Sequence, residues 1–184
     1  MAFGVEGTRV RLVPLDADRH LENCYRWVND PGVTDQLAIG HFPSTRVQEA
    51  DFFEKLQRPG DSDIVWAIET LDGRHIGMSG LHQISLLHGT AKSGSFLGEP
   101  GERGQGFGTE SATLRSRYAF MTLGLRVLYS EYFEGNIASQ RMQEKCGYQT
   151  WGVKPAAEWK NGQFRNLVQT YLPRDRWLEL NPLG

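Results

Sequence analysis

The spacing of apolar residues changes along this chain, and each spacing predicts one kind of element. Residues 8–14 read TRVRLVP, an alternation of polar and apolar side chains that predicts a short strand. Residues 17–29 carry apolar side chains at helical spacing, and Asp16 stands where a helix cap is expected. The turn formed by residues 29–32, Asn-Asp-Pro-Gly, should end this first helix.

A second helix and three strands should follow. The helix is predicted over residues 45–57, with Ser44 as its cap and Arg58-Pro59-Gly60 as its stop. Asp72-Gly73 indicates a tight hairpin, because type I′ turns require positive φ. Denser apolar and β-branched residues predict the strands themselves over residues 64–70, 75–84 and 92–97.

The C-terminal half opens with a glycine-rich turn and a long amphipathic helix, which should run from Gly106 to Gly124. Its apolar stripe consists of Phe107, Leu114, Tyr118, Met121 and Leu125. The remaining predicted elements are a strand over 127–133, a helix over 138–145 ended by Gly147, and strands near 148–153 and 164–172. This order of elements predicts a mixed α/β fold around one sheet.

Length and charge narrow the class of protein. A chain of 184 residues with 39% hydrophobic and 23% charged residues suits one folded domain over residues 1–184. A net charge of −2 gives no general electrostatic basis for binding nucleic acid or an anionic membrane. The sequence shows neither a basic and apolar leader nor an apolar run that spans a bilayer, so we expect a cytoplasmic protein.

The cysteines and histidines show no ligand pattern. Cys24 and Cys146 fall in different predicted helices, and two free thiols are expected in a cytosolic chain. The five histidines lack the HxxxH or Cys/His spacing of metal ligands. We therefore predict no metal site.

The turn at residues 101–110, GERGQGFGTE, is the first candidate site, and we call it the glycine turn. Glycines let the backbone approach a ligand closely, and the amides that open a helix lack intrahelical acceptors, so such a turn can bind phosphate. Two common phosphate loops do not fit. Thr109 stands where GxGxxG needs its third glycine, and no GK[ST] follows for a Walker loop. Alone, the pattern is equally typical of an exposed turn rich in glycine.

A second segment favours a functional interpretation. Residues 136–148, NIASQRMQEKCGY, follow the next predicted strand. Together the two segments resemble the acyl-CoA signature of the GCN5-related N-acetyltransferase (GNAT) superfamily. Arg103, Gly106 and Gly108 match its R/Q-x-x-G-x-G/A, Asn136 and Ser139 match N-x-x-S, and EKCGY matches E-K-x-G-F/Y.

Other stretches resemble one branch of that superfamily, the RimJ/RimL-like ribosomal-protein N-terminal acetyltransferases. They are RWVNDP at residues 26–31, the strand at 77–81 and the closing Trp177. The resemblance implies a single GNAT-type domain with about four helices and a mostly antiparallel sheet of six or seven strands. One pair, the strand before the glycine turn and the strand 127–133, should be parallel and splay apart to admit pantetheine. We also consider a homodimer.

The resemblance implies acetyl-CoA as cosubstrate. Its pyrophosphate cradle should consist of Arg103, Gly104, Gln105, Gly106, Phe107 and Gly108. Phe96, Leu97 and Gly98 should pair with the pantetheine arm, with an amide near Leu97 polarising the thioester carbonyl. Asn136 and Ser139 should contact the cofactor from the opposite side, although Asn136 can also cap a helix.

In this family the acceptor amine attacks the thioester directly in a ternary complex. A base must take the proton of the amine, and a donor must stabilise the leaving thiolate. Many members use a tyrosine as donor where this chain has Gln143, so we expect Ser139 to donate that hydrogen bond instead. Glu99 is the expected base, and Glu102 is its alternative.

Two other positions are less favoured for the base. Glu131 is a weaker candidate than either of the others. The branch often carries an aspartate in the last hairpin, but this chain has Asn166 there. A base at that position is therefore not expected.

By the same resemblance, residues 27–41 and 149–165 should shape the acceptor site, with Trp151, Trp159 and Phe164 among them. The acceptor is a primary amine on a protein N-terminus or on a small molecule, and the sequence leaves this choice open. Two other functions are considered. A non-catalytic CoA-binding or sensing module of the same fold would release no thiol with any amine. An unrelated nucleotide-binding enzyme would be displaced by ATP or NAD and not by CoA.

Overall fold

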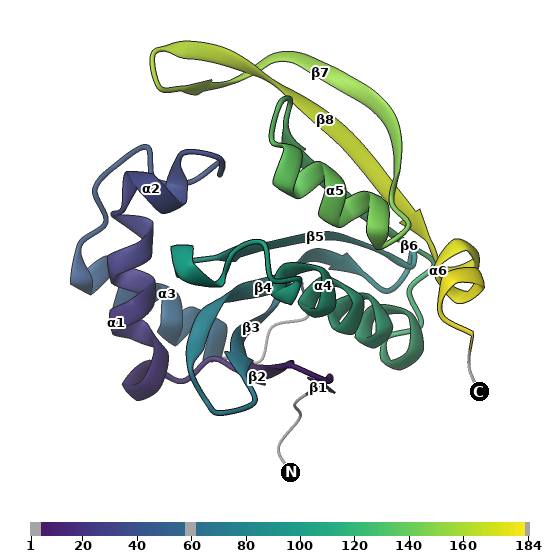
Figure 1. Ribbon diagram of the computed structural model, residues 1–184, viewed down its shortest axis with the longest axis horizontal. Coiled ribbons are helices and arrows are strands. Elements are labelled where there is room, and N and C mark those ends of the chain that lie inside the picture. Colours follow the sequence, from purple (N-terminus) through teal and green to yellow (C-terminus); the bar gives the residue numbers. More distant parts are fainter. Residues whose placement is uncertain (1–4, 58–61, 183–184) are drawn as a thin grey trace.

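The computed structural model describes residues 5–57 and 62–182. Its strands are β1 (Val5–Glu6), β2 (Val10–Pro14), β3 (Ile64–Thr70), β4 (His75–Ser85), β5 (Thr90–Leu97), β6 (Val127–Phe133), β7 (Gln149–Lys160) and β8 (Gln163–Pro173). Its helices are α1 (Ala17–Val28), α2 (Pro31–Thr34), α3 (Arg46–Gln57), α4 (Phe107–Arg117), α5 (Ile137–Lys145) and α6 (Arg174–Leu180) (Figure 1).

The strands form one sheet in the order β1-β2-β3-β4-β5-β6-β8-β7. Every neighbouring pair is antiparallel except β5 and β6, which run parallel and are joined through α4. The predicted mixed fold with one parallel pair is confirmed. Over the described residues the sheet has eight strands rather than the predicted six or seven. The same residues form six α-helices rather than the predicted four or so. The short elements β1, α2 and α6 carry too few residues to show a period.

Helices cover both faces of the sheet, and the strands therefore carry apolar residues on both sides. Trp66 and Ile68 of β3 belong to the core cluster that includes Leu114 of α4. Ala67, between them, belongs to a second cluster with Trp27 of α1. Successive strand side chains point to opposite faces, so this alternation places α4 and α1 on opposite sides of the sheet. The two helices lie apart in Figure 1.

The helix starts follow capping chemistry. Asp16 caps α1 as predicted, and its side chain accepts a hydrogen bond from the Arg19 amide at 3.1 Å. The cap of α3 is Thr45 rather than Ser44. The Thr45 hydroxyl accepts from the Gln48 amide at 3.2 Å, while the Gln48 side chain accepts from the Thr45 amide at 2.8 Å. The predicted stop at Arg58-Pro59-Gly60 lies outside the described residues.

The long amphipathic helix changes geometry near its end. After α4 the chain forms a π-helical turn, Tyr118–Thr122, in which the Leu123 amide bonds to the Tyr118 carbonyl at 3.2 Å. A π turn adds a residue to the repeat and rotates the apolar stripe. Met121 is consequently 40% exposed, so its place in the predicted buried stripe was wrong. Gly124 follows with φ +67°, as expected of a helix-ending glycine.

Both cysteines are free, as expected, and both are buried. Burial raises the pKa of the Cys24 thiol to about 12, which makes it unreactive at neutral pH. Among the helices of the described chain, none combines the length and the apolar character needed to cross a bilayer.

Candidate functional site

The glycine turn connects β5 to α4 through a 3₁₀ turn, Pro100–Glu102. Gly104 and Gly106 adopt φ of +76° and +87°, a region that other L-residues rarely occupy. Within the described chain, no backbone amide of residues 104–109 donates a hydrogen bond to another residue. The start of α4 therefore presents a run of free donors at the positive end of a helix dipole, as a phosphate cradle requires.

Two arginines hold this turn. Arg9 donates to the Gln105 carbonyl at 2.7 Å, pairs with Glu110 at 3.2 Å, and lies over the Phe107 ring at 5.5 Å. Arg103 donates to the carbonyls of Gly32 at 3.1 Å and Leu97 at 3.3 Å. The predicted cradle residue Arg103 thus connects the turn to both α2 and β5. Arg9, 96 residues from Gln105, has no signal in the local sequence.

An open cleft of about 740 Å³ lies beside the start of α4. Its lining includes Gly106 and Thr109, together with Arg9, Arg117 and Lys145. The cleft therefore adjoins Gly106 and Thr109, two of the residues whose amides are free.

The strands β5 and β6 separate after a short ladder. Residues 90–92 of β5 pair with residues 127–129 of β6, and pairing stops there although both strands continue. We call the region beyond Lys92 and Tyr129 the divergence. The Gly98 amide donates to Ile76 of β4 at 2.9 Å, so the alternation of an antiparallel ladder directs the Leu97 amide toward β6. This amide is unpaired in the described structure, as the predicted contact with a pantetheine arm requires.

Gly98 has a structural reason to be glycine. A Cβ there would lie 2.0 Å from the Trp27 indole. The indole Nε1 donates to Glu99 Oε1 at 3.1 Å, and Arg26 forms an ion pair with the same oxygen. Trp27 of α1 therefore packs against the end of β5 and holds Glu99 there.

The predicted bases are engaged in ion pairs. Glu99 uses Oε1 for Arg26 and Trp27, and its Oε2 has no hydrogen-bond or ion-pair partner among the described residues. Glu102 pairs with Arg74 and accepts from the Gln105 side chain at 3.3 Å. Glu99 keeps one oxygen free to accept a proton, whereas both oxygens of Glu102 have partners.

The start of α5 brings the second predicted segment to the divergence. The Asn136 side chain caps the helix by accepting from the Ser139 amide at 3.1 Å, and it also donates to the Gln36 carbonyl at 3.5 Å. Ser139 is half-buried, and its hydroxyl has no partner in the described part of the chain. Gln143, four residues later on the same helix face, is only 4% exposed and bonds to Ser130 and Thr170.

The two predicted acceptor segments meet in space. Lys160 is 5% exposed and donates from Nζ to the Ile39 carbonyl at 2.6 Å. His41 Nε2 hydrogen-bonds to the Trp159 carbonyl at 3.0 Å. Two further hydrogen bonds join the same segments, from Asn161 to Asp35 and from Arg165 to Gln36. We call these contacts between residues 35–41 and the β7–β8 hairpin the acceptor clamp.

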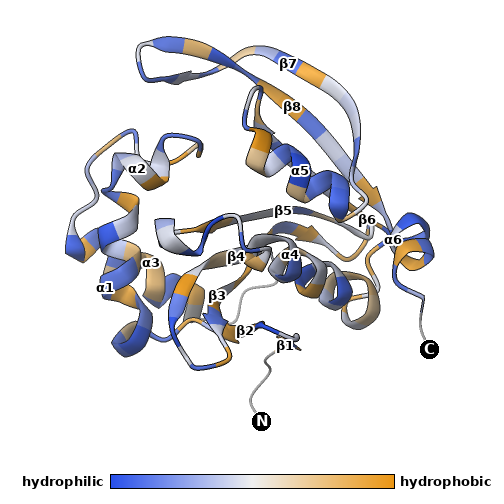
Figure 2. Ribbon diagram, in the orientation of Figure 1, coloured by the Kyte–Doolittle hydropathy of each residue, from blue (hydrophilic) through white to orange (hydrophobic). Residues whose placement is uncertain are grey.

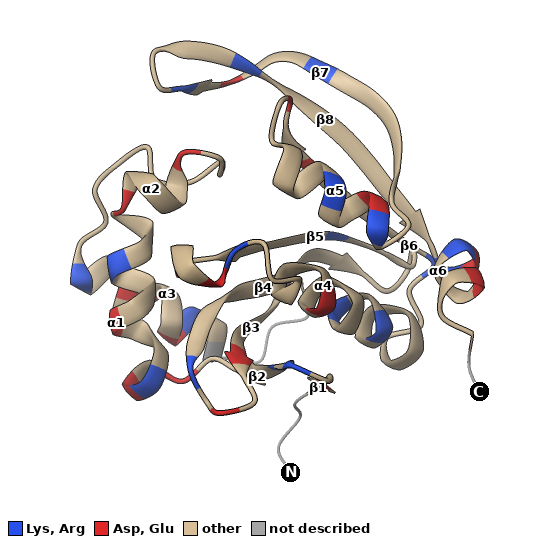
Figure 3. Ribbon diagram, in the orientation of Figure 1, with Lys and Arg blue, Asp and Glu red and all other residues tan. Residues whose placement is uncertain are grey.

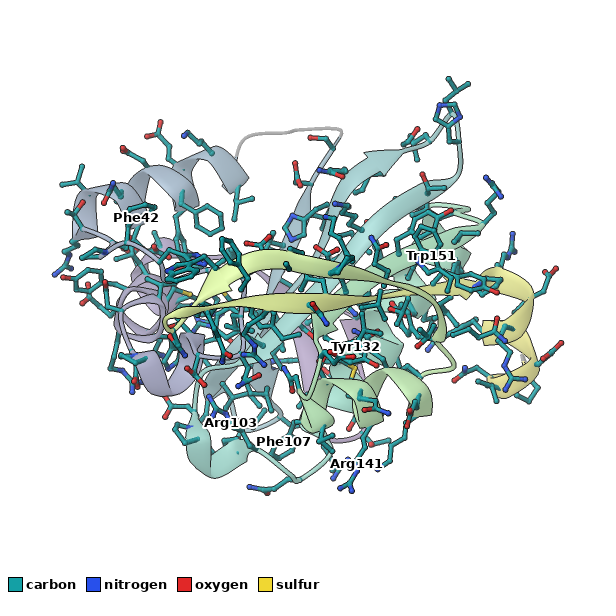
Figure 4. The ribbon with its side chains drawn as sticks, turned by 90° about the horizontal axis from the view of Figure 1, so that it is seen from above. Phe42, Arg103, Phe107, Tyr132, Arg141 and Trp151 are labelled. Carbon is teal, nitrogen blue, oxygen red and sulfur yellow. The ribbon has the colours of Figure 1, made fainter. Side chains whose placement is uncertain are left out.

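The predicted aromatic residues of the hairpin are exposed rather than core. Trp159 and Phe164 stack edge to face with centroids 5.0 Å apart, and they are 54% and 64% exposed. Hydrophobic and hydrophilic residues alternate along the hairpin in Figure 2, and its basic residues are spread along it in Figure 3. In the view from above, Arg103 and Phe107 lie on one side of the hairpin and Phe42 lies on the other (Figure 4).

One carboxylate near the hairpin was missed. Asn166, where the family often has an aspartate, donates to Glu134 Oε2 at 2.9 Å. Glu134, Arg165 and Asn166 line a pocket of about 270 Å³ together with Gln163 and Phe164. An acidic group therefore lies beside the position from which the sequence excluded one. Glu134 lies beside Asn166 because the loop between β6 and α5 bonds to β8, where the Glu134 amide donates to the Asn166 carbonyl at 3.0 Å.

The chain is similar to known acetyltransferases in sequence and in fold. A family model described as "Acetyltransferase (GNAT) domain" matches residues 9–149. An uncharacterised N-acetyltransferase, YoaA of Bacillus subtilis, is 33% identical over 100 residues, which are 54% of this chain. The match spans 56% of the length of that relative.

Solved structures share the fold at low sequence identity. The spermidine N-acetyltransferase from Vibrio cholerae in complex with CoA and spermine has a TM-score of 0.86 at 17% identity, over 94% of this chain and 99% of the other. A GCN5-related N-acetyltransferase from Brucella melitensis reaches 0.77 at 24% identity, over 96% and 81%. Mycobacterium smegmatis RimJ in complex with CoA-disulfide reaches 0.81 at 14% identity, over 95% and 85%.

Proposed function

This chain belongs to the GNAT acetyltransferase family and is an N-acetyltransferase, and from this premise we propose that it transfers an acetyl group from acetyl-CoA to a primary amine by direct attack in a ternary complex. The observation that carries the cosubstrate proposal is the run of free amides at the start of α4, beside the unpaired edge of β5. The CoA bound to the V. cholerae and M. smegmatis proteins supports it.

The residues present fit acetyl-CoA, which supplies an activated thioester. In this proposal the amides of residues 104–109 bind the pyrophosphate, and Arg103 keeps the glycine turn against Leu97. Phe96, Leu97 and Gly98 form the edge along which the arm lies, and the free Leu97 amide polarises the acyl carbonyl. Asn136 contributes mainly by capping α5, which orients Ser139.

The chemical roles follow from which side chains have free atoms. Ser139 has an uncommitted hydroxyl on the face of α5 that it shares with Gln143, and we assign it the hydrogen bond to the leaving thiolate. We assign Glu99 as the base, acting through Oε2 on the amine or through a water, because Oε1 is held by Arg26 and Trp27. Glu102 has no such free oxygen.

The acceptor is assigned as a primary amine that enters through the acceptor clamp, either on a protein N-terminus or on a small molecule. The polyamine in the V. cholerae complex is consistent with the second class. The segment RWVNDP and the fold likeness to RimJ support the RimJ/RimL-like branch and the first class. We further assign one domain over residues 1–184 and a cytoplasmic location, which the two free cysteines suit.

Acceptor profiling tests this function most directly. Purified protein is incubated with acetyl-CoA and a panel of N-terminal peptides, polyamines and aminoglycosides, and the released thiol is measured. Thiol release with at least one amine, together with CoA binding by calorimetry, is the expected result. CoA binding without turnover across the panel would instead identify a non-catalytic module.

A homodimer is the oligomeric state we assign to the chain. The edge strand β7 exposes Trp151 and Val153, and an unpaired edge with apolar side chains favours association with a second copy. Light scattering after size exclusion should give twice the chain mass of 20.8 kDa. A monomeric mass at micromolar concentration would contradict the assignment.

A further inference from the structure

The cleft beside the start of α4 continues past the glycine turn to two basic side chains. Gly106 and Thr109, whose amides are free, line it at the start of the helix. Glu110, Leu114 and Arg117 line it further along, and their spacing of four and three residues places them on one helix face. A single cleft therefore joins the free amides to the end of α4.

Lys145 lines the same cleft from the end of α5. The next residue, Cys146, is 5% exposed and donates from Sγ to the Thr109 carbonyl at 3.6 Å. The same sulfur lies 3.8 Å from the Thr113 hydroxyl oxygen. These contacts hold the end of α5 against the first two turns of α4, and they bring Lys145 next to the glycine turn.

The charge of the cleft differs in sign from that of the whole chain. Arg117 and Lys145 are exposed, and neither side chain has a partner in the described part of the chain. Arg9, the third basic residue of the lining, pairs with Glu110. Glu6 is the other acidic residue of the lining, and it is exposed. Three basic and two acidic side chains give the lining a net charge of +1, whereas the chain carries −2.

The direction of the Arg117 side chain follows from helix geometry. A helical side chain covers the surface over the turn before its own Cα, because the Cα–Cβ bonds tilt toward the start of the helix. Arg117 follows Thr109 by eight residues, a rise of roughly 12 Å. Its long side chain shortens this gap, since it extends back along α4 toward the free amides.

CoA has a group that suits these two cations. Its pyrophosphate is joined on one side to the pantetheine arm and on the other to an adenosine whose ribose carries a 3′-phosphate. In the proposed binding mode the arm follows the edge of β5 at Leu97, and the pyrophosphate lies on the amides of residues 104–109. The ribose is attached directly to the pyrophosphate, so the 3′-phosphate enters the cleft that Arg117 and Lys145 line.

We propose that Arg117 and Lys145 form a subsite for the 3′-phosphate of CoA and select CoA over dephospho-CoA. The inference rests on the proposed use of acetyl-CoA. Because neither side chain has another partner, both can form charge-assisted hydrogen bonds with phosphate oxygens without giving up existing contacts. Both are exposed, so salt should screen their attraction for the phosphate.

Calorimetry with CoA and dephospho-CoA measures the subsite without relying on turnover. At low salt, wild type should bind CoA about tenfold more tightly than dephospho-CoA. Arg117→Gln and Lys145→Gln should each lower this preference about threefold by weakening CoA binding alone. The double variant should bind both ligands equally. Both side chains are exposed, so the variants should keep the fold.

Two further measurements separate a phosphate contact from a change in the shape of the cleft. Raising the salt concentration from about 0.05 M to about 0.5 M should lower the preference of wild type and leave that of the double variant unchanged. In the double variant, KM for acetyl-CoA should rise while kcat is retained. The 3′-phosphate is remote from the thioester, so its contacts are the same in the ground state and in the transition state.

Lys154→Gln is the matched control. Lys154 is an exposed lysine of β7 that also has no side-chain partner among the described residues, and it does not line the cleft. The substitution removes the same charge from the chain. It should therefore keep the wild-type preference for CoA.

The outcomes are distinct. Equal affinities of wild type for CoA and dephospho-CoA, or an unchanged preference in the folded double variant, would overturn the subsite. An equal loss of preference in Lys154→Gln would assign the effect to net charge and would also overturn it. A loss confined to the two cleft variants supports it. Failure of wild type to bind either nucleotide would instead contradict the proposed cosubstrate, on which the subsite depends.

Discussion

The cofactor half of the candidate site and the acceptor half are held together by different kinds of contact. At the glycine turn the key groups are backbone amides, arranged by two left-handed glycines and the start of α4 within a few residues of chain. In the acceptor clamp the key groups are side chains that reach across 118 and 121 residues, from Trp159 to His41 and from Lys160 to Ile39.

The difference matters for how each half can change. A backbone cradle tolerates most substitutions that keep its φ angles, because its donors belong to every residue. A clamp built of side chains is lost or remade by single substitutions. A common cofactor and a variable acceptor within one fold are the expected outcome of such a division.

The largest effect should come from the cradle. Gly106→Asp places a carboxylate at the free amides, forces a side chain into φ +87°, and brings its Cβ within 2.7 Å of Arg9. CoA affinity should fall at least a hundredfold, equivalent to about 3 kcal/mol, as measured by calorimetry. Gly162→Asp is the control for backbone strain, since Gly162 has φ +79° and open space at the hairpin tip. Unchanged affinity in folded Gly106→Asp would remove the cradle assignment.

The second largest effect is expected at Ser139, the proposed hydrogen-bond donor to the leaving thiolate. Ser139→Ala should lower kcat and kcat/KM together by roughly tenfold to a hundredfold, the scale of one hydrogen bond to developing charge. The helix cap uses the Ser139 amide and the Asn136 side chain, so thermal stability should be retained. A higher KM for acetyl-CoA with kcat preserved would show a binding role only. Steady-state kinetics and a melting curve separate these results.

A smaller and more selective effect is expected in the clamp. Lys160→Met removes the bond to Ile39 and should raise KM for the acceptor about tenfold, while KM for acetyl-CoA stays the same. Lys154→Met, at an exposed position on the same hairpin, is the control. Equal changes in both KM values would show that the two halves are not independent.

The smallest effect on activity is expected from His75, whose main effect should be on the pH dependence of folding stability. Burial, with the nearby His20, lowers the pKa of His75 to about 4 from 6.5. Because the unfolded state then binds the proton more readily, stability falls as the pH drops from 6.5 toward 4. From pH 7 to pH 5 this amounts to about 2 kcal/mol.

Urea unfolding at both pH values measures this loss. His75→Gln should lose less stability than wild type over the same interval, since it removes the titrating group. His88→Gln, at an exposed position, should behave as wild type. Identical losses in His75→Gln and wild type would exclude His75 as the source.

Elements with local signals could be predicted from the amino-acid sequence. The strands 64–70 and 127–133 were predicted with the bounds they have, and the order of elements followed from periodicity and turn signals. The one parallel pair followed from the resemblance to the GNAT superfamily. The glycine turn was also predictable, because positive φ and free helix-start amides are properties of a short stretch of chain. Asn136 as a cap belongs to the same class.

Which side chains are available for chemistry depends on contacts between residues that are distant in the chain. Glu99 and Glu102 looked alike in the sequence, but Arg26, Trp27 and Arg74 reach them from other elements and leave only Glu99 with a free oxygen. Gln143 was noted as a missing tyrosine, and only the fold shows it bonded to Ser130 and Thr170. Such contacts join residues distant in the chain, and neither periodicity nor capping chemistry carries information about them.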